Sequence, residues 1–390
     1  MSDSPLITSL RAEARDAPES GIVEVFNYGR NRPGLIPLWV GEGDLPTPDF
    51  VVAAANQSLA RGETFYTYQR GIPELRQALA DYHGRLLGGQ FPAERFFVTG
   101  GGMQAIQIAA RMVAGTGDEV VIPVPCWPNI TAAVAISGAR PVPVPMGFGN
   151  AGWTLDLDRL FDAVSDRTRA IFLNSPSNPT GWTATRAELE AIRQFAAKRG
   201  LWIIADEVYG RFFYEGPRAA SFYDIADRDE RILYVNTFSK NYAMTGWRIG
   251  WLSAPIELGQ TIENLIQYST SGVAAFMQRA ATVALNEGDA FLEMQVARAR
   301  EGRRICCSTL AATGRVRLAE PDGAFYLFFA VDGETDSRSL ALRLVDEANV
   351  GVAPGIAFGD DTGFMRICFA RSASQLEEAA GRLAEWLKPA

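Results

Sequence analysis

Apolar runs and amphipathic stretches alternate through the middle of this 390-residue chain. Most of the runs are continuously apolar, as in strands that are covered on both faces. Alternation of such strands with helices predicts a mostly parallel α/β sheet, and the prolines in residues 140–145 indicate an edge strand or an irregular one. The predicted strands are residues 120–124, 140–145, 170–173, 201–205, 232–235 and 249–253. The predicted helices between them are residues 106–113, 156–164 and 186–199.

The two ends of the chain depart from this alternation. Residues 1–35 are mixed polar with several turn residues, and we interpret them as an arm. Helical patterns dominate residues 257–310, and the chain beyond Val316 combines short strands with helices, which predicts a smaller α+β domain. The strands expected there are residues 324–329 and 364–369, and the helices are residues 339–349 and 373–387. The predicted parts are an N-terminal arm with part of the small domain (1–45), a large α/β domain (46–285) and a C-terminal small domain (286–390).

Composition and charge narrow the class of protein. The net charge is −8 and no stripe of Lys and Arg stands out, so neither nucleic acid nor a membrane is an expected partner. No apolar stretch reaches membrane-spanning length and the start lacks a signal-peptide pattern, which predicts a cytoplasmic protein. The four cysteines lack metal-binding spacing, and His83, the only histidine, is predicted at the end of a surface helix. No metal site is therefore expected.

Polar and aromatic side chains follow several of the predicted strands. Gly101 and Gly102 open a helix whose free N–H groups suit a phosphate, although a glycine turn before a helix is common. Trp127 lies in a loop after a strand, where it could stack on a flat ring or simply pack in the core. Asn178 lies in a segment rich in Asn, Pro and Gly, a composition that turn formation alone explains.

Asp206 directly follows the apolar run 201–205, and a carboxylate at that place needs a cationic partner. A protonated pyridine nitrogen would be such a partner, and the pair would maintain the ring as an acceptor of electrons. Tyr209, three residues later, could hydrogen-bond an oxygen on that ring. Acids at strand ends also cap helices, so this segment alone leaves both interpretations open.

Lys240 lies between two apolar runs. Loss of hydration there disfavours the ammonium and frees the amine as a nucleophile. The hydroxyls of Thr237 and Ser239 and the guanidinium of Arg248 suit a dianion nearby. An amine that forms a Schiff base beside a phosphate pocket is what pyridoxal 5'-phosphate (PLP) chemistry requires. A lysine without these neighbours would be interpreted as a surface residue.

Together these segments resemble the class I/II aminotransferases, the aspartate aminotransferase group within the fold type I PLP enzymes. The resemblance runs from roughly residue 35 to the end and rests on motifs in family order. They are Ser-Asn-Pro-Thr-Gly (177–181), Ala-Asp-Glu-Val-Tyr (205–209), Ser-Lys…Gly-Trp-Arg-Ile-Gly (239–250), Pro-Asp-Gly-Ala-Phe-Tyr (321–326) and Met-Arg-Ile-Cys-Phe-Ala (365–370). The resemblance implies transfer of an amino group between an α-amino acid and a 2-oxo acid by a ping-pong mechanism.

The resemblance also implies roles for individual residues. Lys240 would hold PLP as a Schiff base and move the proton between substrate Cα and cofactor C4′, and Asp206 would pair with the ring nitrogen. Asn178 and Tyr209 would hold the ring oxygen, and Trp127 would stack on the ring. Trp127 and Asn178 would also border the substrate. The expected phosphate-binding residues are Gly101, Gly102, Met103, Thr237, Ser239 and Arg248.

Contacts to substrate and to a second subunit follow from the same resemblance. Arg366 would clamp the substrate α-carboxylate through both arms of its guanidinium, and Gly41 lies in a loop expected to close on that carboxylate. Tyr66 would reach the phosphate bound in a neighbouring subunit, and Tyr68 is the alternative for this role. An obligate homodimer with shared active sites is therefore implied.

Two other functions stay open at this level. A PLP-dependent β-lyase of the C–S lyase type would use the same fold and the same Schiff base. A PLP-binding transcription regulator would need a helix-turn-helix module, for which the roughly 35 residues before the matching region are too few. The amino donor is not identified, and a neutral or aromatic one is favoured because no second carboxylate clamp is evident. Four arginines are candidates for such a clamp, and none is singled out: Arg30, Arg32, Arg70 and Arg279.

Overall fold

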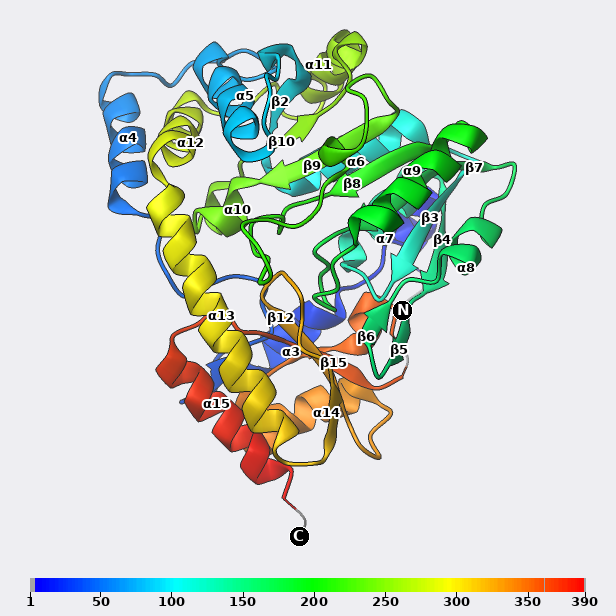
Figure 1. Ribbon diagram of the computed structural model, residues 1–390, viewed down its shortest axis with the longest axis vertical. Helices are drawn as coiled ribbons and strands as arrows, with labels where there is room; N and C mark the ends of the chain where they lie inside the picture. Colours follow the sequence, from blue (N-terminus) through cyan, green and yellow to red (C-terminus); the bar gives the residue numbers. More distant parts are fainter. Residues whose placement is uncertain (1–3, 361, 389–390) are drawn as a thin grey trace.

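A seven-stranded sheet forms the centre of the larger part of the protein (Figure 1). The computed structural model describes residues 4–360 and 362–388. In order across the sheet the strands are β2 (Phe96–Thr99), β10 (Gly250–Ser253), β9 (Ile232–Thr237), β8 (Trp202–Asp206), β7 (Thr168–Asn174), β3 (Glu119–Val124) and β4 (Arg140–Pro145). β10 runs antiparallel to both of its neighbours, and the other pairs described in this sheet are parallel. The predicted mostly parallel α/β sheet is therefore confirmed.

Burial on both faces explains why these strands show no alternation in the sequence. Ile203, Ile204 and Ala205 of β8 are all buried, although successive side chains point to opposite faces of the sheet. β4 lies at the edge of the sheet. Its prolines lack the N–H groups that pair strands, and an edge strand tolerates this because only one of its sides is paired. The helices of this part are α4 (Asp49–Ala60), α5 (Pro73–Leu87), α6 (Gly101–Val113), α7 (Pro128–Ile136), α8 (Leu157–Asp162), α9 (Arg186–Arg199), α11 (Gly259–Gln267) and α12 (Ala275–Glu287).

Three neighbouring parallel strands end side by side. β7 ends at Asn174, β8 at Asp206 and β9 at Thr237, and Asn174 lies opposite Asp206 in the register. α10 (Phe238–Asn241) follows β9 immediately and brings Lys240 to the same edge. In open α/β sheets, ligands bind outside the carboxyl ends of the strands. The sheet thus gathers residues from distant segments where a ligand is expected.

The C-terminal part contains a second, antiparallel sheet (Figure 1). Its strands in order are β11 (Val316–Leu318), β12 (Tyr326–Val331), β15 (Phe364–Cys368) and β14 (Ala353–Pro354). The helices beside it are α13 (Asp289–Ala311), α14 (Ser337–Arg343) and α15 (Ala373–Trp386). The strands predicted at 324–329 and 364–369 and the helix predicted at 373–387 are present with shifts of one or two residues at their ends.

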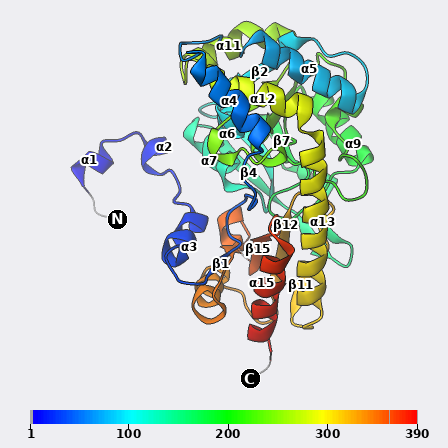
Figure 2. The same cartoon turned by 90° about the vertical axis from the view of Figure 1, so that its left-hand side faces the viewer.

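The N-terminal arm returns to this C-terminal part (Figure 2). Its helices are α1 (Pro5–Thr8), α2 (Ala12–Arg15) and α3 (Gly21–Gly29). β1 (Ile36–Pro37) pairs in parallel with β13 (Val350–Gly351), and α3 packs against β14 and α14. α3, β1 and the C-terminal elements therefore form one packed unit, whereas α2 contacts α7. The domain boundaries after residues 45 and 285 stay a prediction.

One local prediction is confirmed with a change of helix type, and another is wrong. The helix expected at 339–349 is α14 followed by a π-helical turn, η5 (Leu344–Ala348), which ends at Asn349 with a left-handed φ of 54°. His83 is buried rather than at the surface, with its ring centre 4.6 Å from that of Phe96. It lies on the apolar face of α5, where the Leu79 carbonyl oxygen is 2.7 Å from Nδ1. Burial lowers the pKa of His83 to about 4.

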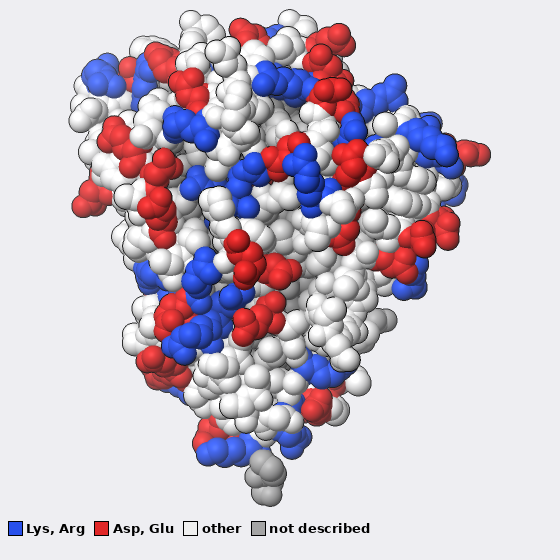
Figure 3. Space-filling model, viewed as in Figure 1, with Lys and Arg blue, Asp and Glu red and all other residues white. Residues whose placement is uncertain are grey.

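The surface and the cysteines add little to the candidate chemistry. Acidic and basic side chains are interspersed over the face shown in Figure 3. Within the two described ranges, no helix has the length and apolar character needed to cross a membrane. In the same ranges, no group of three His, Cys, Asp or Glu side chains is arranged to hold a metal ion. The four cysteines, Cys126, Cys306, Cys307 and Cys368, are buried and form no disulfide.

Candidate active site

A cavity of about 630 Å³ lies where the ends of β7, β8 and β9 meet side chains of the C-terminal sheet. Its lining comes from the arm, the start of α6, the loops after β3 and β7, the end of β8, the segment after β9, and strands β12 and β15. Twelve of the predicted site residues line it: Gly41, Gly102, Met103, Trp127, Asn178, Asp206, Tyr209, Thr237, Ser239, Lys240, Arg248 and Arg366. The structure therefore brings these separate motifs to one place.

Lys240 is partly buried in this cavity, and its Nζ donates a hydrogen bond to the Gly41 carbonyl oxygen at 2.7 Å. Burial lowers the pKa of Lys240 to about 8, and the nearby positive charge of Arg366 acts in the same direction. A substantial share of the amine is therefore neutral near pH 8. Gly41 itself has no room for a side chain, because a Cβ there would lie 2.3 Å from the Tyr326 hydroxyl oxygen.

Asp206 is buried at the end of β8. The Val208 backbone N–H donates to its carboxylate at 3.3 Å, and the Asn174 side chain holds its backbone carbonyl oxygen at 3.1 Å. Burial raises the pKa of Asp206 to about 7, against the opposing effects of the Val208 N–H and of Lys240. A cation placed next to this carboxylate would stabilise its ionised form.

Arg366 lies on β15 and is 2% exposed. Its Nη1 donates to Asn178 Oδ1 at 2.8 Å, its Nη2 donates to the Trp39 carbonyl oxygen, and among the described residues its buried Nε has no acceptor. The ring centres of Tyr326 and Phe358 lie 4.5 and 4.7 Å from the guanidinium carbon. The guanidinium is thus fixed in orientation and still has a donor that lacks a partner.

Trp39 connects Arg366 with the arm. Its backbone binds Arg366, and its buried ring fills the space between α3 and β13. A Cβ on Gly29 of α3 would lie 2.7 Å from this ring, and one on Gly351 of β13 would lie 2.1 Å from it. Phe26 of α3 also contacts the ring edge to face, with 5.8 Å between ring centres. Glycines at these two places are therefore required for the packing of Trp39.

A second group of residues forms a cradle near the start of α6. Gly101 has a left-handed φ of 80°, and a Cβ there would lie 2.6 Å from the Arg248 guanidinium. Thr237 Oγ1 lies 2.9 Å from Ser239 Oγ and accepts the Ser239 backbone N–H at 3.1 Å. The exposed Arg248 side chain is held by a hydrogen bond from Nη1 to the Thr245 carbonyl oxygen at 2.8 Å. Gly101 does not itself line the cavity, but its lack of a side chain leaves room for the Arg248 guanidinium.

Several lining residues were not singled out from the sequence. Tyr326 lies in a quoted motif, and its hydroxyl is 2.6 Å from that of Tyr209. Asn174 ends a strand as Asp206 does, so the same strand-end signal could have identified it. Ile22 and Val23 of α3 also line the cavity, and no local pattern connects these two residues with the site.

Tyr66 lies outside the cavity of its own chain. It is 92% exposed, and Phe65 and Tyr68 beside it are 84% and 64% exposed. A lone chain therefore does not bring any of these three rings to its own site.

Three of the four candidate clamp arginines bind acidic residues away from the cavity. Arg32 pairs with Asp346, Arg70 Nε lies 2.6 Å from Glu263, and Arg279 lies between Glu63 and Glu74 at 3.2 and 2.8 Å. Arg30 is exposed and does not line the cavity.

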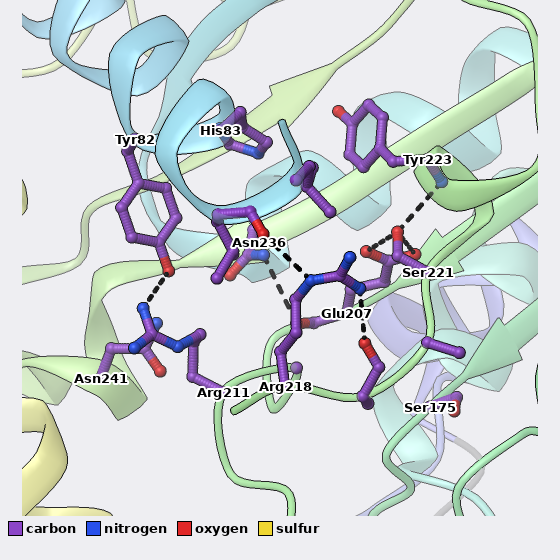
Figure 4. Close-up of a pocket in the computed structure, with 15 residues that line it drawn as sticks. Tyr82, His83, Ser175, Glu207, Arg211, Arg218, Ser221, Tyr223, Asn236 and Asn241 are labelled. Atoms are coloured by element: carbon purple, nitrogen blue, oxygen red, sulfur yellow. Dashed lines mark hydrogen bonds between the residues drawn. The ribbon is translucent and has the colours of Figure 1, made fainter. Parts of the chain in front are cut away.

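Glu207, next to Asp206, faces a separate small cavity (Figure 4). The Ser221 hydroxyl lies 2.8 Å from both carboxylate oxygens, and the Phe222 N–H donates to one of them at 3.4 Å. Burial raises the pKa of Glu207 to about 7. Asp206 is the last residue of β8 and Glu207 follows it directly, and these neighbouring acids face different cavities.

The raised pKa of Glu207 predicts a pH-dependent stability. Its protonated form is favoured in the folded state, so stability falls as pH rises from about 4.5 to about 7 and stays lower above that. Glu207→Gln keeps a hydrogen-bonding partner for Ser221. The decrease in the free energy of unfolding between low and high pH should be smaller in this variant by up to about 3 kcal/mol. Urea unfolding at pH 5 and pH 8 measures it, with the exposed Glu287→Gln as control. Equal pH dependence in Glu207→Gln and the parent protein would contradict the prediction.

Comparison with known proteins agrees with the motifs. Residues 33–383 match the family described as aminotransferase class I and II. An aspartate aminotransferase of Pyrococcus horikoshii is 33% identical over 373 residues, covering 95% of each chain. An aromatic-amino-acid aminotransferase of Thermococcus litoralis is 34% identical, covering 95% of this chain and 96% of the relative.

Solved structures give the same result. A mutant aspartate aminotransferase of Thermus thermophilus has a TM-score of 0.90 at 33% identity, covering 97% of this chain and 99% of that chain. An aspartate aminotransferase of Thermotoga maritima has a TM-score of 0.89 at 32% identity, covering 97% and 100%. The predicted fold and family are confirmed. The chain belongs to the class I and II aminotransferase family, and it is an aminotransferase.

Proposed function

We propose that the cavity binds PLP and that the enzyme uses it to move an amino group between an α-amino acid and a 2-oxo acid. The side chains present fit this group. A buried carboxylate with a raised pKa suits a protonated ring nitrogen, and a partly neutral amine suits the aldehyde. The glycine turn, two hydroxyls and a guanidinium suit the phosphate. The observation that carries the proposal is the placement of Lys240, Asp206 and Arg366 around one cavity.

The cofactor, when bound, would supply a ring that withdraws electrons from the substrate Cα. Asp206 would keep the ring nitrogen protonated, and Asn178 and Tyr209 would donate hydrogen bonds to the ring oxygen. Trp127 would stack on the ring. Lys240 would hold PLP covalently and, once released by substrate, carry a proton between the two carbons that exchange it; a pKa of about 8 suits this task.

The phosphate would be held by the cradle near α6. Gly101, Gly102 and Met103 would supply backbone N–H groups at a helix start, where the helix dipole favours an anion. The hydroxyls of Thr237 and Ser239 and the guanidinium of Arg248 would add further donors. This assignment accounts for an arginine that is exposed in the chain without ligand.

The substrate α-carboxylate would bind to Arg366. Its guanidinium is held by Asn178 and Trp39, so little conformational entropy remains to be lost on binding. The Nε without an acceptor is a donor that a carboxylate could satisfy. Gly41 would lie beside that carboxylate, where the close Tyr326 hydroxyl excludes any larger residue.

A homodimer with shared sites completes this proposal. Tyr66 would contact the phosphate bound in a second copy of the chain, and the exposure of Phe65, Tyr66 and Tyr68 supports an interface there. We also propose a cytoplasmic location. Several relatives are named for aspartate or for aromatic amino acids, and these amino acids are the first substrates to test.

Transfer of a labelled amino group tests the function. The PLP-loaded enzyme is incubated with ¹⁵N-labelled amino acids and an unlabelled 2-oxo acid. We expect the label in the amino acid formed from the 2-oxo acid, together with the 2-oxo acid of the donor. Release of pyruvate and ammonia from a β-substituted donor, without labelled product, would instead identify a β-lyase and contradict the proposal.

A further inference from the structure

Several of the side chains that line the cavity are apolar. Ile22, Val23 and Phe26 of α3 and Met103 at the start of α6 are among them, and we call these four residues the apolar wall. Val23 is 52% exposed in the chain without ligand, and Phe26 and Met103 are partly exposed. Apolar surface left open at the edge of a binding cavity gains stability when an apolar group covers it.

Each cationic side chain of the cavity already has a role in the proposed function. Among the described residues that line it, the positively charged ones are Lys240, Arg248 and Arg366. The proposed function uses Lys240 and Arg248 for the cofactor and Arg366 for the α-carboxylate. A second carboxylate on the substrate would find no further cation among the described residues of the cavity lining.

The polar groups near the apolar wall do not replace a cation. Glu42 lines the cavity and accepts a hydrogen bond from Thr245 Oγ1 at 2.9 Å, so it would repel a second carboxylate. Asn129 directs its amide toward the sulfur of Met103 at 3.6 Å. The Ser20 hydroxyl accepts the Val23 N–H at 3.4 Å as the cap of α3. Burying an unpaired carboxylate against these groups is costly.

We propose that the preferred amino donor carries a large apolar side chain that packs on the apolar wall. This inference rests on the proposed function. Phenylalanine and leucine represent this class, and aspartate and glutamate represent the class that the cavity disfavours. This preference differs from that named for several of the relatives, which are aspartate aminotransferases. It follows from the side chains of α3 and Met103, which lie outside the reacting centre.

The first test compares donors on the PLP-loaded enzyme with one common 2-oxo acid acceptor. We expect kcat/KM for phenylalanine or leucine to exceed that for aspartate and glutamate by at least about 10-fold. A preference for aspartate or glutamate would overturn the inference while leaving aminotransfer intact. Absence of transfer from every donor would instead contradict the proposed function itself.

A second test measures binding without turnover. Calorimetry on the PLP-loaded enzyme gives the dissociation constants of 3-phenylpropanoate and of maleate, which carry one and two carboxylates. We expect 3-phenylpropanoate to bind at least about 10-fold more tightly. Equal or tighter binding of maleate would indicate a cation contributed by a second copy of the chain and would overturn the inference.

Two variants of α3 test whether the apolar wall itself determines the preferred donor. Val23→Arg adds a cation to the apolar wall at an exposed position, and we expect the ratio of kcat/KM for aspartate to that for phenylalanine to rise at least about 10-fold. Asn27→Arg adds the same charge on the same helix but outside the cavity lining, and the ratio should stay within about 3-fold of the parent enzyme. Equal ratios in both variants would contradict a role for the apolar wall.

Discussion

Lys240→Ala should lower the rate of amino-group transfer by at least about 10³-fold. The variant loses the amine that would hold the cofactor and carry the proton, and no other lysine lies in the described cavity lining. Transfer of ¹⁵N from donor to product measures the loss. Borohydride reduction followed by peptide mass spectrometry should find the cofactor on the peptide containing residue 240 in the parent enzyme and not in the variant.

Two further variants distinguish this role from a general effect of charge. Lys198→Ala removes an exposed lysine from α9 and should leave the rate unchanged. Lys240→Arg keeps the positive charge but should remain inactive, because a guanidinium does not release its proton near neutral pH. An active Lys240→Arg enzyme, or a reduced cofactor found on another peptide, would refute the assignment.

Arg366→Lys should reduce kcat/KM for an α-amino acid by about 10²-fold or more, chiefly through KM. Lysine retains the positive charge but lacks the planar guanidinium. In the parent enzyme Asn178 and Trp39 hold this guanidinium, and its Nε stays available for the carboxylate. Steady-state kinetics measure the change. Primary amines that lack the carboxylate should react equally poorly with the parent enzyme and the variant.

Comparison of α-amino acids with primary amines distinguishes binding of the carboxylate by Arg366 from a role of this residue in folding. Arg317→Lys, an exposed change on β11 of the same sheet, should leave both unaffected. If Arg366→Lys lowered the rates with the amine and with the amino acid by the same factor, the residue would support the structure rather than bind the carboxylate.

Local signals predicted much of the larger sheet. Continuous apolar runs indicated the buried strands, and α9 spans the predicted residues 186–199. Its ends are specified locally, because Thr185 and Glu188 form a capping box and Gly200 adopts a left-handed φ of 67°. Elements with such signals can be bounded from the sequence alone.

Features that depend on distant contacts escaped prediction. His83 has a polar side chain, yet tertiary packing buries it among aromatic rings. The antiparallel direction of β10 is set by its neighbours rather than by its own residues. α3 reaches the cavity because β1 pairs with β13 across more than three hundred residues of sequence, and no pattern in the arm announces that pairing.

In the candidate site, too, residues in local motifs were predicted and contacts between distant segments were not. Lys240, Asp206 and Asn178 lie in motifs that the family resemblance identifies, and they line one cavity. The contact between Tyr209 and Tyr326 joins two motifs that could be read only separately. The apolar wall lacks a motif altogether, since its contribution arises from how the arm folds back.

The buried Trp39 has a consequence for how selectivity could change over evolutionary time. Through its backbone it grips the guanidinium of Arg366, and through its ring it anchors α3 to β13. Trp39 would therefore help to position both the residue that binds the α-carboxylate and the helix that contacts the side chain of an incoming amino acid, while Lys240 lies on α10 after β9. Substitutions along α3 can thus retune which donor is accepted while the reacting atoms keep their alignment.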